Sequence, residues 1–182
     1  MAVADPFDYA VEQFAQRIRS PLLDPVFFGL SSAADHGLLW FALASLRAAR
    51  KGDPTIALRM AAALGVESGL TNGPIKLLFR RIRPVLAEPD EPLPYGLHRP
   101  VTSSFPSGHA TSGFTAASLL GQGRRAQPLY YALAGLVAFS RVYVRLHHGS
   151  DVVAGTALGL GFGRVARRVA PLEPSGASTP AG

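Results

Sequence analysis

The stretch SRVYVRLHHGSD, residues 140–151, closes one long apolar run and opens the next. It holds two histidines, two arginines and an aspartate, although ionisable groups beside a membrane-like segment are costly to desolvate. His147 and Asp151 are four residues apart, so on a helical continuation the carboxylate reaches the imidazole. A carboxylate on one ring nitrogen leaves the other free to attack or to accept a proton. In the other interpretation Asp151 is simply the N-cap of the next helix, and these residues alone do not decide.

The composition indicates an integral membrane protein. The chain has 182 residues, which predicts one domain, and charged residues make up only 16% against 48% apolar residues. The charges lie at the edges of the apolar blocks. There is no cysteine, so disulfides and thiolate metal sites are excluded. The net charge is +6, but no Lys/Arg run exceeds two residues, so basic loop ends of a membrane protein explain it better than nucleic-acid binding.

The hydrophobic pattern predicts an all-α membrane bundle. Residues 7–19 place apolar groups at helical spacing opposite polar ones, which predicts an amphipathic helix lying in the membrane interface. About five transmembrane helices are predicted from the apolar runs at 26–46, 55–79, 106–120, 127–146 and 152–170. We expect one domain over residues 1–170, followed by a disordered Pro/Ser/Gly/Ala-rich tail at 171–182.

Polar and small residues mark particular points of these runs. Asp35 and His36 interrupt the first run and Glu67 the second, and each is expected to pair with a polar neighbour. Pro84 is expected to end the second helix, and the proline-rich residues 85–105 predict a loop outside the hydrocarbon. Glycines recur every fourth residue in the last run, which predicts a seam for close helix packing at Gly155, Gly159 and Gly163.

The orientation follows from where the turns fall. With five spans, the turns at 47–59 and 121–126 and the end of the last helix lie on one side, and their basic residues predict a cytoplasmic side. The opposite side, with residues 76–105 and 140–151, is basic as well, so the count of charges does not discriminate. We expect this side to face outward, because several of its basic residues are suited to chemistry.

The first basic cluster is at residues 76–84. Lys76 and Arg83 are seven residues apart, so on a continuous helix they share a face, and Arg80 lies on that face as well. Three cations on one face repel each other unless an anion sits among them, and arginine forks with a lysine point charge suit phosphate. The alternative is that these side chains snorkel to lipid headgroups.

The second cluster is the sequence PSGH at residues 106–109. Ser107 and Gly108 are predicted to stand at a helix N-terminus, where free backbone N–H groups point at an anion. His109 is placed to donate a proton to that anion. The alternative is an ordinary helix start with an interfacial histidine.

The stretch at residues 140–151 is the third cluster, because Arg141 precedes His147 by six residues. Each cluster taken alone has an ordinary structural explanation. Their common placement at three helix ends on one side of the membrane does not, and it favours the chemical interpretation for all three.

The combination resembles the type 2 phosphatidic acid phosphatase (PAP2) superfamily, whose motifs are Lys-x6-Arg-Pro, Pro-Ser-Gly-His and Ser-Arg-x5-His-x3-Asp. The chain matches every motif position, between residues 76 and 151. The resemblance implies that His147 is a nucleophile that forms a phosphohistidine, that Asp151 orients it, and that His109 protonates the leaving group. It also implies a set of groups that hold the phosphoryl oxygens: Lys76, Arg83, Ser107, Gly108 and Arg141.

Other candidates fit less well. His148 is also within helical reach of Asp151, but only His147 has the family spacing. Arg80 and Arg145 are further phosphate candidates. Phosphoryl transfer mostly requires positioning and charge neutralisation, which these cations supply, so we expect no metal and no other cofactor.

The expected function is a metal-independent lipid-phosphate phosphatase of the cytoplasmic (inner) membrane, with membrane lipids around it and its site on the extracytoplasmic side. A polyprenyl phosphate or diphosphate, or a prenyl-phosphoryl phosphoribose, is favoured as substrate, and phosphatidylglycerol phosphate and phosphatidic acid are alternatives. Vanadium haloperoxidases share the motifs but are soluble and much longer. A non-catalytic phospholipid-binding or carrier protein is the alternative of another class, but it has no use for the His147–Asp151 pair.

Overall fold

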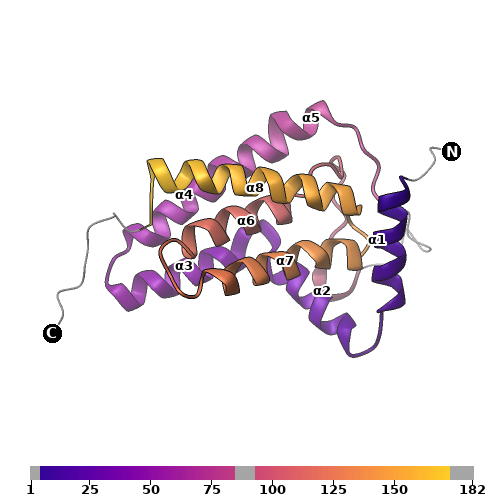
Figure 1. Cartoon of the computed structure of the whole chain (residues 1–182), viewed down its shortest axis with the longest axis horizontal. Helices are drawn as coiled ribbons and strands as arrows, with labels where there is room; N and C mark the ends of the chain where they lie inside the picture. The colour runs from indigo at the N-terminus through magenta and orange to yellow at the C-terminus, as the bar shows by residue number, and fades with distance from the viewer. Residues whose placement is uncertain (1–4, 85–92, 173–182) are drawn as a thin grey trace.

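The computed structural model describes residues 5–84 and 93–172, and within these ranges every regular element is helical (Figure 1). The longer helices are α1 (Pro6–Arg17), α2 (Leu23–Ala33), α3 (Leu38–Lys51), α4 (Thr55–Leu70), α6 (Gly108–Leu120), α7 (Gln127–Tyr143) and α8 (Gly149–Val169). Short helical segments are η1 (Asp35–Gly37), η2 (Thr71–Ile75), α5 (Lys76–Leu78) and η3 (Pro94–Gly96). The prediction of an all-α fold is confirmed.

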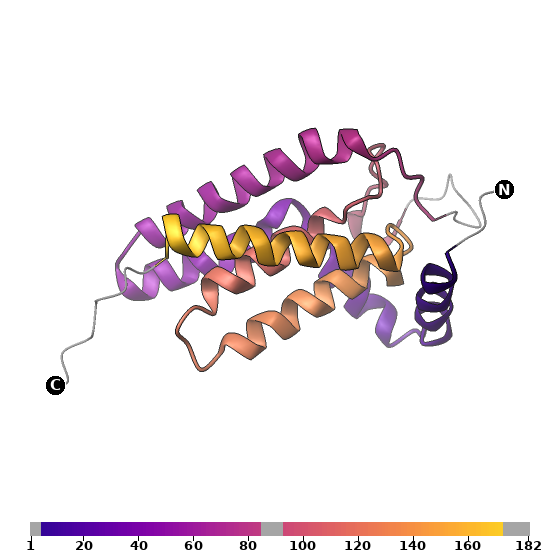
Figure 2. The same ribbon diagram turned by 45° about the horizontal axis from the view of Figure 1, so that its top comes forward.

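Helix α6 forms the centre of the bundle. It packs against α8, α7 and α4, and Figures 1 and 2 show it between these neighbours. Its residues are mostly small, and all those from Thr115 to Leu120 are buried. Small side chains allow neighbouring helix backbones to approach closely, which explains why the Ser/Thr/Ala/Gly-rich run became the core helix.

The glycine seam of α8 faces α6. A Cβ atom at Gly159 would lie 2.4 Å from the carbonyl oxygen of Thr111, and one at Gly155 would lie 2.5 Å from that of Ser107. Gly163 meets the side chain of Ser118 in the same way. The predicted seam is therefore confirmed, and it fixes the depth at which the start of α8 lies against the start of α6.

The first apolar run is not one continuous helix. It is divided into α2 and α3 at η1, where His36 and Gly37 have φ angles of +52° and +74°, so the two parts meet at 60°. Such positive φ angles are incompatible with a continuing α-helix. The predicted helix over 26–46 is therefore broken into two, and the break places Asp35 beside His109 of α6.

The second apolar run ends earlier than expected. Helix α4 stops at Leu70, a π-helical segment containing Pro74 follows, and α5 ends at Leu78, with Phe79 already extended. Proline lacks the N–H of a regular helix and its ring clashes with the preceding turn, which accounts for the irregular segment. Pro84 does not end this helix. The expectation that Lys76, Arg80 and Arg83 share one helix face is therefore also wrong.

No helix in the described part of the chain combines the length and the apolar composition needed to cross a bilayer by itself. Helix α2 and residues 35–51 meet these requirements only as a bent pair. The expected number of five spans is therefore not confirmed. The outer surface is nevertheless apolar, since Leu58, Leu129 and Val153 are each more than half exposed.

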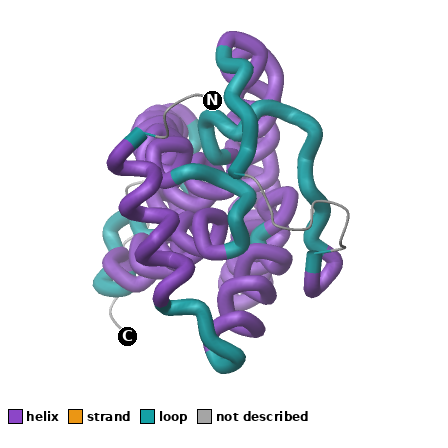
Figure 3. The backbone as a smooth tube through the Cα atoms, turned by 90° about the vertical axis from the view of Figure 1, so that its right-hand side faces the viewer, coloured by secondary structure: helices purple, strands orange, loops and turns teal. Residues whose placement is uncertain are grey.

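The predicted turns lie at one end of the bundle and the motif residues at the other. At one end Arg47 donates to the carbonyl of Leu120, and Arg59 donates to those of Pro171 and Leu172, so the three predicted turn segments do lie together. Leu172 is buried in the core, and residues 173–182 of the expected tail lie outside the described residues. At the other end, which Figure 3 views directly, α1 lies beside the start of α8 and the loops that carry the motif residues.

We expect Gly159→Ala to lower the free energy of unfolding by about 1–3 kcal/mol, because its Cβ would press on the backbone of α6. Gly161→Ala is the matched control on the same helix, since nothing lies within 4 Å of its added Cβ. The control should be neutral or stabilising by up to about 1 kcal/mol, owing to the higher helix propensity of alanine. Thermal unfolding in detergent measures both, and equal effects would contradict the close packing of α6 and α8.

Candidate active site

The three predicted clusters meet around one cavity of about 480 Å³ at the α1 end of the bundle. Six of the eight predicted site residues line it: Lys76, Arg83, Gly108, His109, Arg141 and His147. Ser107 and Asp151 are fully buried behind this lining. Arg80 and Arg145 do not line this cavity. Asp35 and Glu67 also line the cavity. From the sequence, each was expected only to pair with a polar neighbour.

His147 is held in a tight loop between α7 and α8. The loop folds back on the end of α7, because the N–H groups of Leu146 and His147 both donate to the carbonyl of Arg141, at 3.0 and 3.1 Å. Arg145 makes this turn possible with a φ of +58°. The imidazole of His147 is only 2% exposed, so its position is fixed by the surrounding protein.

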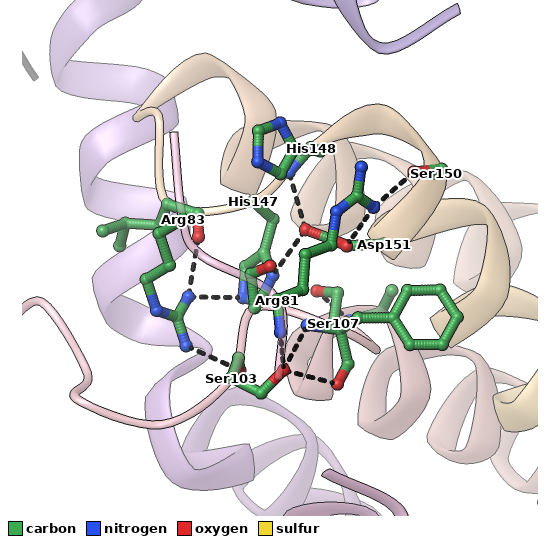
Figure 4. Close-up of polar contacts among 12 residues, drawn as sticks. Arg81, Arg83, Ser103, Ser107, His147, His148, Ser150 and Asp151 are labelled. Atoms are coloured by element: carbon green, nitrogen blue, oxygen red, sulfur yellow. Dashed lines mark hydrogen bonds and ion pairs between the residues drawn. The ribbon is translucent and has the colours of Figure 1, made fainter. Parts of the chain in front are cut away.

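Arg83 defines the tautomer of His147. Its Nη1 atom lies 3.2 Å from Nε2 of His147 and donates to the carbonyl of Leu146 at 2.6 Å (Figure 4). A guanidinium can only donate, so Nε2 carries the lone pair and a neutral imidazole has its proton on Nδ1. Nδ1 faces Oδ2 of Asp151 at 3.7 Å, slightly beyond hydrogen-bonding distance. The nucleophilic lone pair therefore points away from Asp151 and toward the arginine.

The ionisation of this pair suits nucleophilic attack. Burial lowers the pKa of His147 to about 3; Asp151 opposes this shift, and the charges of Arg141 and Arg83 add to it. Burial likewise lowers the pKa of Arg83, to about 10. At neutral pH the imidazole is therefore unprotonated while the guanidinium beside it remains a cation.

Arg83 is placed by an extended segment rather than by a helix. Its Nε donates to the carbonyl of Pro100 at 3.1 Å, and the N–H of Ser104 donates to the carbonyl of Arg81 at 3.0 Å. The hydroxyl of Ser104 adds a bond to the carbonyl of Ile82 at 3.3 Å. Residues 79–84 are thereby bound to residues 100–104, which brings Arg83 over the cavity although the helix has already ended.

Asp151 both contributes to the cap of α8 and faces His147. Its Oδ2 accepts the N–H of His148 at 2.8 Å, and its Oδ1 accepts Nη1 of Arg81 at 2.7 Å. His148 is the N-cap residue and Asp151 the third residue of a capping box, so Asp151 is not itself the N-cap. The two interpretations of this residue are compatible, because the capping contact holds the carboxylate on the side of His147.

His148 is directed away from the cavity. Its Nδ1 lies 2.5 Å from Oε1 of Glu12 in α1, and its Nε2 lies 3.1 Å from the carbonyl of Ile82. Both ring nitrogens are occupied by these contacts. The structure therefore separates the two adjacent histidines, and only His147 opens to the cavity.

His109 is paired with a residue that the sequence did not connect to it. Its Nε2 lies 3.0 Å from Oδ1 of Asp35, which stands at the break between α2 and α3. The signal for this residue was its presence in an otherwise apolar run, because an ionisable group there requires a partner. The bond across the bundle, however, depends on the break in the helix.

The remaining motif residues form the walls of the cavity or lie directly behind them. Arg141 is 2% exposed and donates to the hydroxyl of Ser31, and Lys76 is buried as well. Ser107 is the N-cap of α6, as predicted; its hydroxyl accepts the N–H of Ala110 at 3.5 Å, which leaves it behind the cavity wall. Three buried cations, Lys76, Arg83 and Arg141, thus surround the space in front of His147.

Comparisons with known proteins agree with this geometry. Residues 56–173 match the model of the PAP2 superfamily. The chain is 35% identical over 138 residues to decaprenylphosphoryl-5-phosphoribose phosphatase of Mycobacterium tuberculosis, over 75% of each chain. The family match and this relative show that the chain is a phosphoric ester hydrolase. The chain belongs to the PAP2 superfamily.

Two solved structures share the fold over most of its length. LpxE of Aquifex aeolicus has a TM-score of 0.72 and 25% identity, covering 92% of this chain and 99% of that one. The first transmembrane PAP2-type phosphatidylglycerolphosphate phosphatase, from Bacillus subtilis, has a TM-score of 0.67 and 26% identity, covering 88% and 83%. These neighbours identify the chain as a membrane protein, without fixing its number of spans.

We expect the wild-type protein to lose more stability than a His147→Asn variant when the pH is lowered from about 7.5 to about 4.5. The pKa of His147 falls from 6.5 to about 3 on folding, so below pH 6.5 the unfolded chain binds a proton that the folded protein does not. This contribution is full above pH 6.5 and is lost as the pH falls toward 3, by up to ~1.4 kcal/mol per pH unit. Melting temperatures in detergent measure the difference, and parallel pH slopes would contradict it.

Proposed function

We propose that this chain is a membrane lipid-phosphate phosphatase that works through a phosphohistidine on His147. The observation that carries the proposal is that His147, with an unprotonated Nε2, borders a cavity lined by Lys76, Arg83 and Arg141. Among the described residues Nε2 contacts only the Arg83 guanidinium, at 3.2 Å, which an entering phosphoryl group would draw onto its own oxygens. A phosphoryl group placed among these cations would have its phosphorus in front of that lone pair. A covalent intermediate then divides one difficult displacement into two easier ones.

In the first step Nε2 of His147 attacks the phosphorus and the bond from phosphorus to the alcohol oxygen breaks. Lys76, Arg83 and Arg141 neutralise the charge on the non-bridging oxygens, as phosphoryl transfer requires. The bound phosphoryl anion and Asp35, 3.0 Å away, favour the imidazolium form of His109, which gives its proton to the departing alkoxide, so the alcohol leaves neutral. Gly108, also in the lining, has no side chain to prevent close approach of the phosphoryl group.

In the second step water attacks the phosphohistidine. The now neutral His109 takes a proton from this water, the bond from phosphorus to Nε2 breaks, and inorganic phosphate leaves. His147 and His109 are thereby returned to their starting states. Asp151 faces the protonated Nδ1 throughout, and its negative charge stabilises the positive charge on the ring while Nε2 carries the phosphoryl group. The proposed chemistry requires no metal ion.

The position of the site supports an amphiphilic substrate. The cavity lies at the end of the bundle at which α1 packs against α7 and α8, and Phe7, Tyr9 and Phe14 of α1 are about half exposed. Aromatic residues on an amphipathic helix favour the boundary between hydrocarbon and water. We propose that α1 lies in this boundary and that the site faces the extracytoplasmic side, since the basic residues at this end are engaged in the site whereas those of the opposite turns are left to follow the positive-inside rule.

A second cavity supports a substrate with two phosphoryl groups. It measures about 610 Å³ and shares Lys76 and Arg83 with the first cavity. Its lining adds Arg80, Arg81 and Arg99, and none of the described residues that line it is a carboxylate. Neighbouring basic cavities fit a lipid that presents a phosphomonoester to His147 and a phosphodiester next to it.

The substrate that we propose is a polyprenyl-phosphoryl phosphopentose, of which the 5-phosphate is removed. The relative at 35% identity is named for a substrate with both a phosphoryl and a phosphate group on one ribose. Phosphatidylglycerol phosphate, which also contains two phosphoryl groups, is the second candidate, favoured by the transmembrane structural neighbour. Phosphatidic acid contains one phosphoryl group and would leave the second cavity empty.

The test is phosphate release by the purified protein in detergent with excess EDTA, from a polyprenyl-phosphoryl phosphopentose, phosphatidylglycerol phosphate and phosphatidic acid. We expect the highest kcat/KM for the first, and at least about 10³-fold lower turnover for His147→Asn. Arg80→Gln should raise KM about tenfold for the two-phosphate lipids only, because one charge-assisted contact is lost.

Arg164→Gln, which removes an exposed arginine at the opposite end of the bundle, is the matched control. Binding of all three lipids without phosphate release would instead show a carrier protein. An equal effect of Arg80→Gln on one-phosphate and two-phosphate lipids would contradict the role of the second cavity.

A further inference from the structure

Arg81 is not part of any of the three motifs, yet it contacts the carboxylate behind the nucleophile. Its Nη1 donates to Oδ1 of Asp151 at 2.7 Å and to the hydroxyl of Ser150 at 2.6 Å (Figure 4). Its Nη2 is paired with Oδ2 of Asp8 in α1. A single guanidinium therefore bridges two carboxylates that are far apart in the sequence.

Asp8 is an unusual residue for an amphipathic helix. It was expected on the polar side of α1, but it is 2% exposed. Its Oδ1 accepts the backbone N–H of Ser150 at 2.7 Å, and its Oδ2 accepts the hydroxyl of Ser150 at 3.0 Å. The N–H groups of the first helical turn have no partner within their own helix, so α1 supplies a cap for the start of α8.

A second contact connects the same two helices. Glu12 lies one turn after Asp8 on α1 and pairs with His148, the N-cap residue of α8. Gly149 lies against α1 as well, since a Cβ there would be 3.1 Å from the side chain of Val11. Two carboxylates and an apolar contact thus bind α1 to the helix turn that contains Asp151.

The two oxygens of Asp151 have different anchors. Oδ2 accepts from the backbone of His148 and faces His147, whereas the contacts of Oδ1 are with the guanidinium of Arg81. Without that guanidinium the buried carboxylate would lose its counterion and could rotate away from the imidazole. Asp8 in turn holds Arg81, because it binds the nitrogen that Asp151 does not use.

We propose that Arg81 and Asp8 are positioning residues for the nucleophile: Asp8 holds Arg81, Arg81 holds Asp151, and Asp151 orients His147. The catalytic pair is then completed by the N-terminal helix α1, which none of the motifs includes. This inference rests on the proposed function, because it takes His147 as the nucleophile.

The protonation states are consistent with this arrangement. Burial alone would raise the pKa of Asp8, but the hydrogen bonds from Ser150 and from Arg81 outweigh it and lower the pKa. Burial would lower the pKa of Arg81, but the charge of Asp151 and the contacts with Asp8 raise it. Asp8 and Arg81 are therefore both ionised at neutral pH, which is the state that the bridge requires.

The test compares kcat and KM, determined over a range of lipid phosphate concentrations, for Asp8→Asn, Arg81→Ala, Arg81→Lys and the double variant Asp8→Asn/Arg81→Ala. Asp8 lines neither cavity, so Asp8→Asn should lower kcat about tenfold with KM within about twofold. Arg81→Ala should lower kcat about 10²-fold, and Arg81→Lys should recover part of this loss. The double variant should be no slower than Arg81→Ala, because the two residues act through one network.

Asp5→Asn and Arg17→Ala are the matched controls. Asp5 is the exposed N-cap of α1 and asparagine caps equally well, while Arg17 is exposed on the same helix. Both controls should retain wild-type kcat. If Arg81→Ala does not fold, Asp8→Asn and Arg81→Lys still decide the matter, with melting temperatures recorded for each.

The proposal is overturned if Asp8→Asn has the same kcat as Asp5→Asn, if it raises KM at constant kcat, or if the two losses are additive in the double variant. Failure of the proposed function would look different. In that case the wild type would release no phosphate, or His147→Asn would retain its turnover.

Discussion

The buried carboxylate of Asp151 is the interaction on which the geometry of the site depends. It accepts the N–H of His148, binds Arg81 and faces His147, so the start of α8, the 79–84 segment and the His147 imidazole share one anchor. The backbone carbonyl of Asp151 also accepts the N–H of Ser107 at 3.0 Å, which fixes the start of α6 against the start of α8. The glycine seam makes this approach possible. The two helix ends that carry the motif histidines are therefore positioned by the same contacts.

The second constraint is the accumulation of positive charge in front of His147. Lys76, Arg83 and Arg141 are all buried, although burying like charges together costs free energy in the absence of an anion. In the proposed mechanism this arrangement has an advantage, because the charges are already oriented when a phosphoryl group enters. Little reorganisation is then needed as charge develops. The charges of Arg141 and Arg83 add to burial in lowering the pKa of His147, and so help to keep its imidazole unprotonated.

The sequence predicted the helical class, the glycine seam and six of the cavity-lining residues, because motif spacing and periodicity are local patterns. The sequence did not predict the geometry where it is determined by contacts between residues far apart in the chain. The break at His36 needs a positive φ that apolar periodicity does not reveal, and the irregular segment at Pro74 removed the helix face assumed for the basic cluster. The partners of Arg81 are about 70 residues away in both directions, at Asp8 and Asp151, and no local pattern pairs them.

The most direct measurement is the chemical identity of the trapped phosphoenzyme. The protein would be quenched with base during turnover, digested, and the phosphohistidine located by mass spectrometry, with its isomer assigned by chromatography against both phosphohistidine standards. Because Arg83 contacts Nε2 and Nδ1 faces Asp151, the phosphoryl group should be found on Nε2 of His147. A phosphoryl group on Nδ1, or on His109 or His148, would contradict the proposed mechanism.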